Sequence, residues 1–185
     1  MKVPALLLLA LVVGLALPAD EARATIVRPF SLVELTDTAH VIVRGEVIDH
    51  EVVWDPERHE LYTHTTVRVL ESLAGAEPVG ALVVVRQIGG ELDGVARRVV
   101  GTARLDLGDE VVLFARTDGA FLYMVGMAQG AFHVARAPGR PAELRRHAVP
   151  TLAAIAGPAR PPAPDLLALD ALRTEVSRRR AEAGR

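Results

Sequence analysis

The sequence predicts a mainly β domain, a small antiparallel barrel or sandwich with helices only at its ends. Three observations lead to this prediction. Six short segments alternate apolar and polar residues, as half-buried strands do. Turn residues separate these segments, and helical periodicity is confined to the two ends of the chain. The length of 185 residues fits one such domain with a tail.

The composition excludes several classes of protein. Half of the residues are hydrophobic, the formal net charge is −2, and there is no cysteine. The chain is too apolar for a disordered protein, and its charge gives no long-range attraction to nucleic acid. Thiolate chemistry requires cysteine, and Lys2 is the only lysine. We therefore expect no nucleic-acid partner and no cofactor.

The first residues have the layout of a secretory signal peptide. Lys2 precedes an apolar run over residues 5–17, and Ala22-Arg23-Ala24 offers a small-x-small cleavage site. The run is shorter than the roughly 20 residues that a membrane-spanning helix needs. We therefore assign residues 1–24 to a signal peptide. We expect an exported bacterial protein, periplasmic or secreted, without a transmembrane anchor.

A short helix is predicted over Leu32–Thr38. Its start is a capping box, in which the Ser31 side chain caps the first turn and Glu34 reaches back to the Ser31 backbone. The periodicity then changes from helical to alternating. The six predicted strands are His40–Trp54, Tyr62–Leu70, Leu82–Arg86, Glu110–Arg116, Phe121–Val125 and Phe132–Ala135.

Glycines mark two further features of the predicted domain. Gly45 falls on the inward face of the first strand, where a glycine often marks the bend of a strand that coils into a barrel. Five more glycines lie in the connection Ile88–Asp109. A connection of this length is uncommon inside a compact domain and often has a function. We expect a flap or a small extra hairpin there.

The chain changes character after the last predicted strand. Residues 25–136 form the predicted β domain. Residues 137–164 are rich in Pro and Gly and predict a linker, with room for a short helix. Residues 165–185 predict an amphipathic helix that either packs back on an open sheet edge or docks on a partner. Its apolar stripe consists of Leu166, Leu169, Leu172 and Val176.

Three blocks of this sequence, Thr38–Val47, Tyr62–Gly75 and Leu107–Phe114, together carry a family resemblance. Over residues 38–134 the chain resembles the netrin-like modules, which include the tissue inhibitors of metalloproteases, and also exported bacterial proteins with the same blocks. The resemblance implies an OB-like barrel of five to six strands and, as one branch, a protease-related role. The animal inhibitors act through an N-terminal cysteine, which this chain lacks, so no functional residue is implied.

Catalytic motifs are absent from the sequence. None of the three serines lies in a Gly-x-Ser-x-Gly motif, and His59 and His64 do not have the spacing of a zincin motif. Imidazoles and carboxylates gather at the predicted first hairpin, where His50, Asp55 and His59 are candidate metal ligands. The alternative is a solvated hairpin tip, because no fixed ligand spacing supports a metal site. We expect a protein that is not an enzyme.

Candidate contacts for a ligand or partner come from the first hairpin and from the glycine-rich connection. Aromatic rings beside a turn serve either as hairpin anchors or as contact surfaces. A pair of arginines in a loop is either solvated or meets an acidic partner. The candidates are Trp54, Tyr62, Gly89, Gly90, Arg97 and Arg98.

The expected function is that of an exported, monomeric, non-enzymatic binding module that recognises a protein or another envelope ligand. One alternative is a metal-assisted hydrolase that uses His and carboxylate residues. It requires a bound metal or a buried acid–histidine pair in a concave site. The other alternative is a structural envelope component docked through its C-terminal helix. Deletion of residues 157–185 would separate this last alternative from the binding module.

Overall fold

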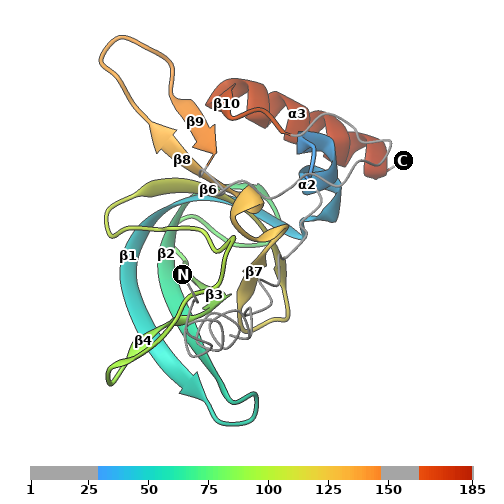
Figure 1. Cartoon of the computed structure of the whole chain (residues 1–185). Helices are drawn as coiled ribbons and strands as arrows, with labels where there is room; N and C mark the ends of the chain where they lie inside the picture. The colour runs from blue at the N-terminus through green and yellow to red at the C-terminus, as the bar shows by residue number, and fades with distance from the viewer. Residues whose placement is uncertain (1–28, 147–162, 185) are drawn as a thin grey trace, which may run out of the picture.

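The computed structural model describes residues 29–146 and 163–184 (Figure 1). The predicted signal peptide and most of the predicted linker lie outside these residues. Within them the chain is mainly β, as the sequence predicts. No helix in this part of the chain combines the length and the apolar character needed to cross a membrane.

The described residues form ten strands and three helical segments. The strands are β1 (Val41–Asp55), β2 (Glu60–Ala74), β3 (Leu82–Ile88), β4 (Gly90–Leu92), β5 (Val95–Arg97), β6 (Glu110–Thr117), β7 (Leu122–Met124), β8 (Ala131–Ala135), β9 (Glu143–Arg146) and β10 (Leu166–Ala168). The helical segments are α2 (Leu32–Thr38), the 3-10 turn η1 (Met127–Gly130) and α3 (Leu169–Ala183).

Eight strands form one sheet, in the order β1-β2-β3-β7-β6-β8-β9-β10, and β1 also pairs with β6. This extra pairing closes β1, β2, β3, β7 and β6 into a ring (Figure 1). All pairings in the ring are antiparallel except that between β3 and β7, which rests on the single pair Val85 and Leu122. The remaining strands β4 and β5 form the small hairpin expected in the glycine-rich connection.

The inner face of the ring is packed with aliphatic side chains. Gly45 lies on this face, and a Cβ at its position would be 2.4 Å from Val67 Cγ1 and 2.7 Å from the Arg68 carbonyl oxygen. The pairing of β1 with β2 shifts register between Arg44 and Gly45. At Gly45 the structure thus shows a close approach of β1 and β2 together with a register shift, which requires a residue without a side chain. The inner core consists of Val41, Val43, Val47, Val67, Val69, Val85, Leu105, Val111, Leu113, Ala115, Leu122 and Ala131.

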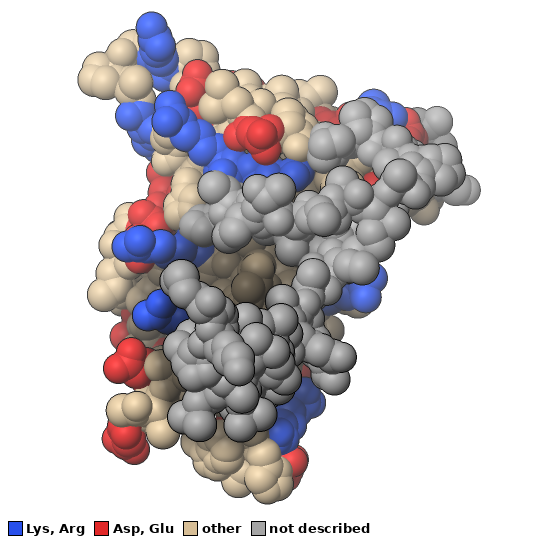
Figure 2. All heavy atoms as spheres, in the orientation of Figure 1, with Lys and Arg blue, Asp and Glu red and all other residues tan. Residues whose placement is uncertain are grey.

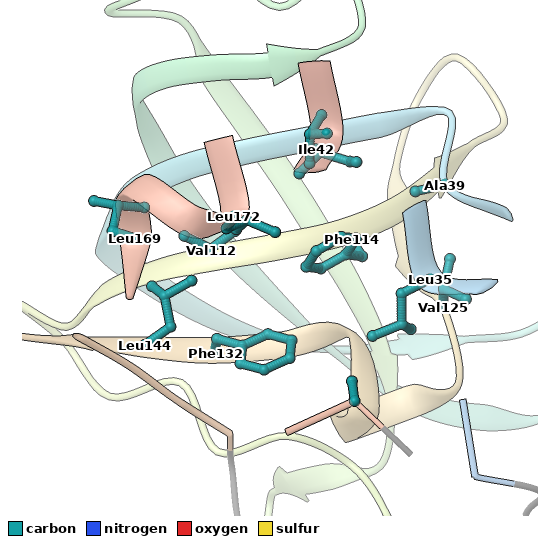
Figure 3. Packing of buried hydrophobic residues seen from close by; sticks show 12 residues of the cluster. Leu35, Ala39, Ile42, Val112, Phe114, Val125, Phe132, Leu144, Leu169 and Leu172 are labelled. Atoms are coloured by element: carbon teal, nitrogen blue, oxygen red, sulfur yellow. The ribbon is translucent and has the colours of Figure 1, made fainter. Parts of the chain in front are cut away.

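A second core covers the outer face of β1, β6 and β8. Figure 3 shows side chains from these strands meeting side chains of α2, α3 and β9 in one apolar layer. Phe114 and Phe132 lie at its centre, with ring centroids 5.8 Å apart. Because of this layer, the first half of β1 is buried on both faces, whereas the sequence predicted a strand buried on one face.

The helix at the start of the chain forms as predicted. The Glu34 backbone N–H donates to Ser31 Oγ (3.2 Å), and the Ser31 N–H donates to Glu34 Oε2 (2.9 Å), which completes the capping box.

The predicted boundaries after residue 136 are wrong in two respects. Glu143–Arg146, placed in the linker, pairs with both β8 and β10 and so extends the main sheet. The final helix begins at Leu169 and not at Asp165, because Leu166–Ala168 pairs with β9 first. Pairing satisfies the backbone groups of these three residues in the sheet. It also leaves Leu166 54% exposed, outside the apolar stripe.

Of the two expectations for the C-terminal helix, the structure shows the one in which it packs back on the sheet. Leu169, Leu172 and Val176 are at most 2% exposed and belong to the outer core. α3 also lies beside α2 at one end of the ring, away from the β4–β5 hairpin (Figure 1). The apolar stripe is therefore buried within the chain itself, and the same stripe cannot dock on an envelope partner.

Candidate functional site

A cavity of about 450 Å³ opens where the β4–β5 hairpin lies against β1, β2 and β3. We call it the mouth cavity. On β2, Thr63 and Thr65 precede Val67 and Val69 at two-residue spacing. The two threonines therefore lie on the same, inner face of the ring. The mouth cavity is lined by His50, Thr63, Thr65, Gln87, Ile88, Gly89, Gly90, Glu91, Ala96, Arg97, Arg98, Val99, Thr102, Ala103 and Leu105.

Polar side chains replace valines at this end of the inner face. Thr65 is 1% exposed and pairs in register with His50 on one side and Val85 on the other. Its Oγ1 lies 3.1 Å from Nδ1 of His50. Thr63 Oγ1 donates to the Gly89 carbonyl (2.8 Å), and Gln87 Nε2 donates to the Ala103 carbonyl (3.1 Å). These hydrogen bonds hold the polar wall of the cavity in place.

The two predicted glycines fold the hairpin over the mouth of the ring. Gly89 and Gly90 have φ of +100° and +143°, which disfavour residues with a Cβ. A Cβ on Gly90 would lie 2.7 Å from Val52 Cγ1 and 2.9 Å from Thr63 Oγ1. The glycines therefore permit the close approach of β4 to the wall, and they line the cavity through their backbone.

The two predicted arginines, Arg97 and Arg98, both line this cavity, but only Arg97 forms an ion pair within the described residues. Arg97 Nε lies 2.8 Å from Glu60 Oε1, a pair that fastens β5 to the start of β2. Arg98 is exposed and forms no ion pair within residues 29–146 and 163–184. Glu91, on the paired strand, also forms none there. The mouth cavity thus carries one cation and one anion that the described chain does not neutralise.

Tyr62 lies elsewhere, on the outer face of the ring. It lines a smaller pocket of about 270 Å³, together with Arg58, Arg86, Tyr123 and Met127 among others. The Arg86 guanidinium lies 3.8 Å above the centre of the Tyr62 ring, a cation–π contact. Odd spacing on β2 places Tyr62 and Thr63 on opposite faces, so the sequence candidates are divided between two sites.

Arg86 organises this outer pocket, and sequence reasoning missed it. Its Nη2 donates to Asp55 Oδ2 at 2.5 Å, and its guanidinium lies 5.1 Å from the centre of the Phe121 ring. The His64 ring stacks on the same Phe121 ring at 4.7 Å. Burial, followed by the nearby Arg86 charge, lowers the pKa of His64. These contacts connect Asp55, Arg86 and Phe121 around the outer pocket.

Trp54 is exposed at the end of the first hairpin. The residue is 51% exposed, and its ring lies nearly perpendicular to the His59 ring, with 6.4 Å between the ring centroids. Trp54 lines neither the mouth cavity nor the outer pocket.

The three candidate metal ligands do not come together. Asp55 accepts hydrogen bonds from the Arg58 and Glu57 backbones and from Arg86, and the pKa of Asp55 is lowered, most strongly by the Arg58 bond. His50 contacts Thr65, and His59 contacts Trp54. No group of three metal-ligating side chains occurs among the described residues.

Acid–histidine pairing does occur, but away from the mouth. Asp109 Oδ2 lies 3.3 Å from His133 Nδ1, and both side chains are about 30% exposed, at 32% and 29%. Neither residue lines the mouth cavity or the outer pocket. This pair does not have the buried, concave setting that the hydrolase alternative requires.

Arginines gather over the β8–β9 hairpin, at the upper left of Figure 2. Carboxylates lie among them: Arg136 pairs with Glu110 at 2.6 Å, and Arg145 approaches Glu143 at 3.8 Å. Arg146 is partly buried, and its guanidinium lies 5.6 Å from the centre of the Phe132 ring. The described surface there carries both arginines and carboxylates.

The comparisons with known proteins give no family for this chain. No protein-family model matches the sequence, and no curated protein matches it. The functional assignment therefore depends on the geometry of the mouth cavity. The sequence predicted the hairpin of this cavity through its glycines and arginines, but it did not predict the polar wall. The available signal for the wall was the pair Thr63 and Thr65, spaced two residues apart just before Val67.

Proposed function

We propose that this protein is an exported, monomeric, non-enzymatic binding module with an OB-like barrel, and that it takes up its ligand at the mouth cavity. The ligand is a protein segment or another envelope molecule. The observation that carries the proposal is the mouth cavity itself. It brings Gly89, Gly90, Arg97 and Arg98, four of the six candidate contacts from the sequence, onto one concave surface.

The strand order supports the OB-like part of the proposal. A five-stranded ring that is closed by pairing of its first strand with a later one is the architecture of this class of barrel. Here β1 pairs with β6, and the sheet order β1-β2-β3-β7-β6 gives five strands. Helices α2 and α3 lie outside this ring, where they cover the outer face of β1 and β6.

The chemistry of the wall supports binding as the function. Thr63 and Gln87 supply a hydroxyl and an amide group, which orient a ligand through hydrogen bonds. The residues are held on strands of the ring, so the wall is formed before the ligand arrives. Export, to the periplasm or the medium, is supported by the signal-peptide pattern of residues 1–24.

A pair of neighbouring substitutions on β5 tests the proposal. Ala96 lines the mouth cavity, whereas Val95 is 63% exposed and does not line it. Ala96→Trp would fill part of the cavity, and Val95→Trp adds a comparable ring outside it. Wild type and both variants are expressed as the full chain, immobilised, and exposed to envelope and medium fractions of the native host. Retained proteins and small molecules are quantified by mass spectrometry.

We expect a ligand that wild type and Val95→Trp retain equally and that Ala96→Trp loses. A metalloprotease retained in this pattern would support the netrin-like branch. Retention that Ala96→Trp leaves unchanged, or the absence of any ligand on the wild type, would contradict binding at the mouth cavity. Circular dichroism of both variants verifies that each is folded.

A further inference from the structure

The mouth cavity carries opposite charges on its two hairpin strands, and this arrangement points to a class of ligand. The inference rests on the proposed function and goes further, because it names what the cavity recognises. Arg98 supplies the cation and Glu91 the anion, and neither is neutralised within the described chain. A ligand with a single charge would satisfy only one of them.

The cation suits a carboxylate. A guanidinium presents two parallel N–H donors that match the two oxygens of a carboxylate. Arg97 cannot serve in the same way, because Glu60 already holds it at 2.8 Å. Arg98 is therefore the available carboxylate receptor at this cavity.

The anion suits an ammonium group, and its position sets a length. Gly90 pairs with Arg97 and Glu91 pairs with Ala96, so Arg98 lies two residues beyond the residue that faces Glu91. Arg98 directly follows β5, and two residues of extended chain place the two backbone positions about 7 Å apart. The α-ammonium and α-carboxylate of an extended peptide of two or three residues are separated by about 7–10 Å.

The wall between the charges suits amide groups. Thr63 and Gln87 offer hydroxyl and amide groups, and no Phe, Tyr or Trp side chain lines the cavity. His50 uses Nδ1 for its contact with Thr65, which leaves Nε2 as the ring nitrogen for a ligand. A site without Phe, Tyr or Trp favours hydrogen-bonded backbone over a stacked sugar ring or base. The volume of about 450 Å³ is in the range of small-ligand sites.

We propose that the mouth cavity binds a short zwitterionic peptide of two or three residues. Arg98 receives its α-carboxylate, Glu91 receives its α-ammonium, and the Thr63 and Gln87 side chains contact its amide groups. Small side chains are favoured because the hairpin lies close to the wall at Gly90.

The test uses trialanine as the probe, with the protein purified after expression of the full chain. Isothermal titration compares trialanine with its N-acetylated and C-amidated forms. Each form is titrated into wild type, Arg98→Gln and Glu91→Gln. Charge-matched control variants lie outside the cavity: Arg140→Gln on the β8–β9 turn and Glu57→Gln on the β1–β2 turn, both exposed.

We expect trialanine to bind and each end-blocked form to lose affinity about tenfold or more, the scale of one charge-assisted pair. Arg98→Gln should reproduce the loss caused by amidation, and Glu91→Gln the loss caused by acetylation. Both control variants should bind as the wild type does. In addition, Arg98→Gln should bind free and amidated trialanine equally, because the receptor for the carboxylate is gone.

Three results would overturn the inference. Trialanine does not bind, or both blocked forms bind as well as the free peptide, or only amidation weakens binding, which would define a simple carboxylate site. The capture experiment with Ala96→Trp separates these failures from a failure of the proposed function. A retained ligand that Ala96→Trp loses, together with no trialanine binding, removes the peptide inference and leaves the binding module in place.

Discussion

Arg180 of α3 donates from Nη2 to the carbonyl oxygen of Ala39, at 2.7 Å and across 141 residues of sequence. The same Nη2 lies 3.3 Å from the Thr36 carbonyl. Both carbonyls belong to the end of α2, where helical backbone lacks hydrogen-bond partners and the helix dipole favours a cation. Arg179 adds an ion pair to Asp37 of the same helix. Helix α3 thus caps the C-terminal end of helix α2.

Arg180→Met should destabilise the fold by about 1–2 kcal/mol, because carbonyls at the end of α2 lose a charged donor. Methionine keeps much of the side-chain volume. Arg178→Met is the matched control, since Arg178 is half-exposed and pairs only with Glu175 and Glu182 of its own helix in the described structure. Urea denaturation should show a much smaller loss for the control than for Arg180→Met, because exposed ion pairs contribute little to stability. Equal losses in both variants would contradict the capping role.

Leu172→Ala should cost about 2–5 kcal/mol, because the side chain is fully buried in the outer core and its removal leaves a cavity. Leu166→Ala, at an exposed position three residues before α3, should cost less than about 0.5 kcal/mol. Thermal unfolding followed by circular dichroism measures both. A mild effect of Leu172→Ala would mean that α3 is not part of the folded domain in solution.

Gly90→Ala should displace the β4–β5 hairpin. The added Cβ meets Val52 and Thr63 in a backbone conformation with φ of +143°, so strain and overlap act together. We expect a loss of about 2–3 kcal/mol. Gly80→Ala is the control, with φ of +87° but no atom within 4 Å of the added Cβ, and should cost about 1 kcal/mol.

The two glycine variants should also differ in where they act. Amide chemical shifts of Thr63, Gln87 and Arg98 should move in Gly90→Ala and stay unchanged in Gly80→Ala. Unchanged shifts around the mouth cavity in Gly90→Ala would show that the hairpin does not lie against the wall.

Glu71 should make the fold sensitive to acid. Hydrogen bonds from Arg173 and then from Arg44 lower its pKa from 4.5 to about 2. Because the folded pKa lies below the unfolded value, the stabilisation is complete above about pH 5 and is lost as the pH falls toward 2. Melting temperatures at pH 7, 4 and 3 should converge between wild type and Glu71→Gln as the pH falls. A constant difference between the two proteins at all three pH values would refute this role.

Local signals in the sequence predicted the ring strands and the first helix well. Ser31 and Glu34 are three residues apart, so their capping box needs no distant partner. Gly45 was also recognisable from its neighbours, because it occupies a position that valines occupy elsewhere in the same alternating segment. The short strands β9 and β10 have three or four residues each, too few to display a period of two. They exist because they pair with one another and with β8, which only the folded chain brings together.

The part of the candidate site that is local in the sequence could also be predicted. Gly89, Gly90, Arg97 and Arg98 are close in sequence, and the structure brings them to one cavity. The wall opposite them comes from three other strands, so its composition depends on register. Tyr62 and Thr63 are neighbours in sequence, yet strand alternation sends one to the outer pocket and the other to the mouth.

The outer core also sets an order of events during folding. Leu35 of α2 and Val176 of α3 are buried in the same layer, although the ring strands lie between these two helices in the sequence. Until α3 packs on the sheet, Phe114 and Phe132 have no complete cover. The outer core can therefore close only when residues 169–176 are present, and a chain truncated before residue 169 would expose an aromatic face that invites aggregation.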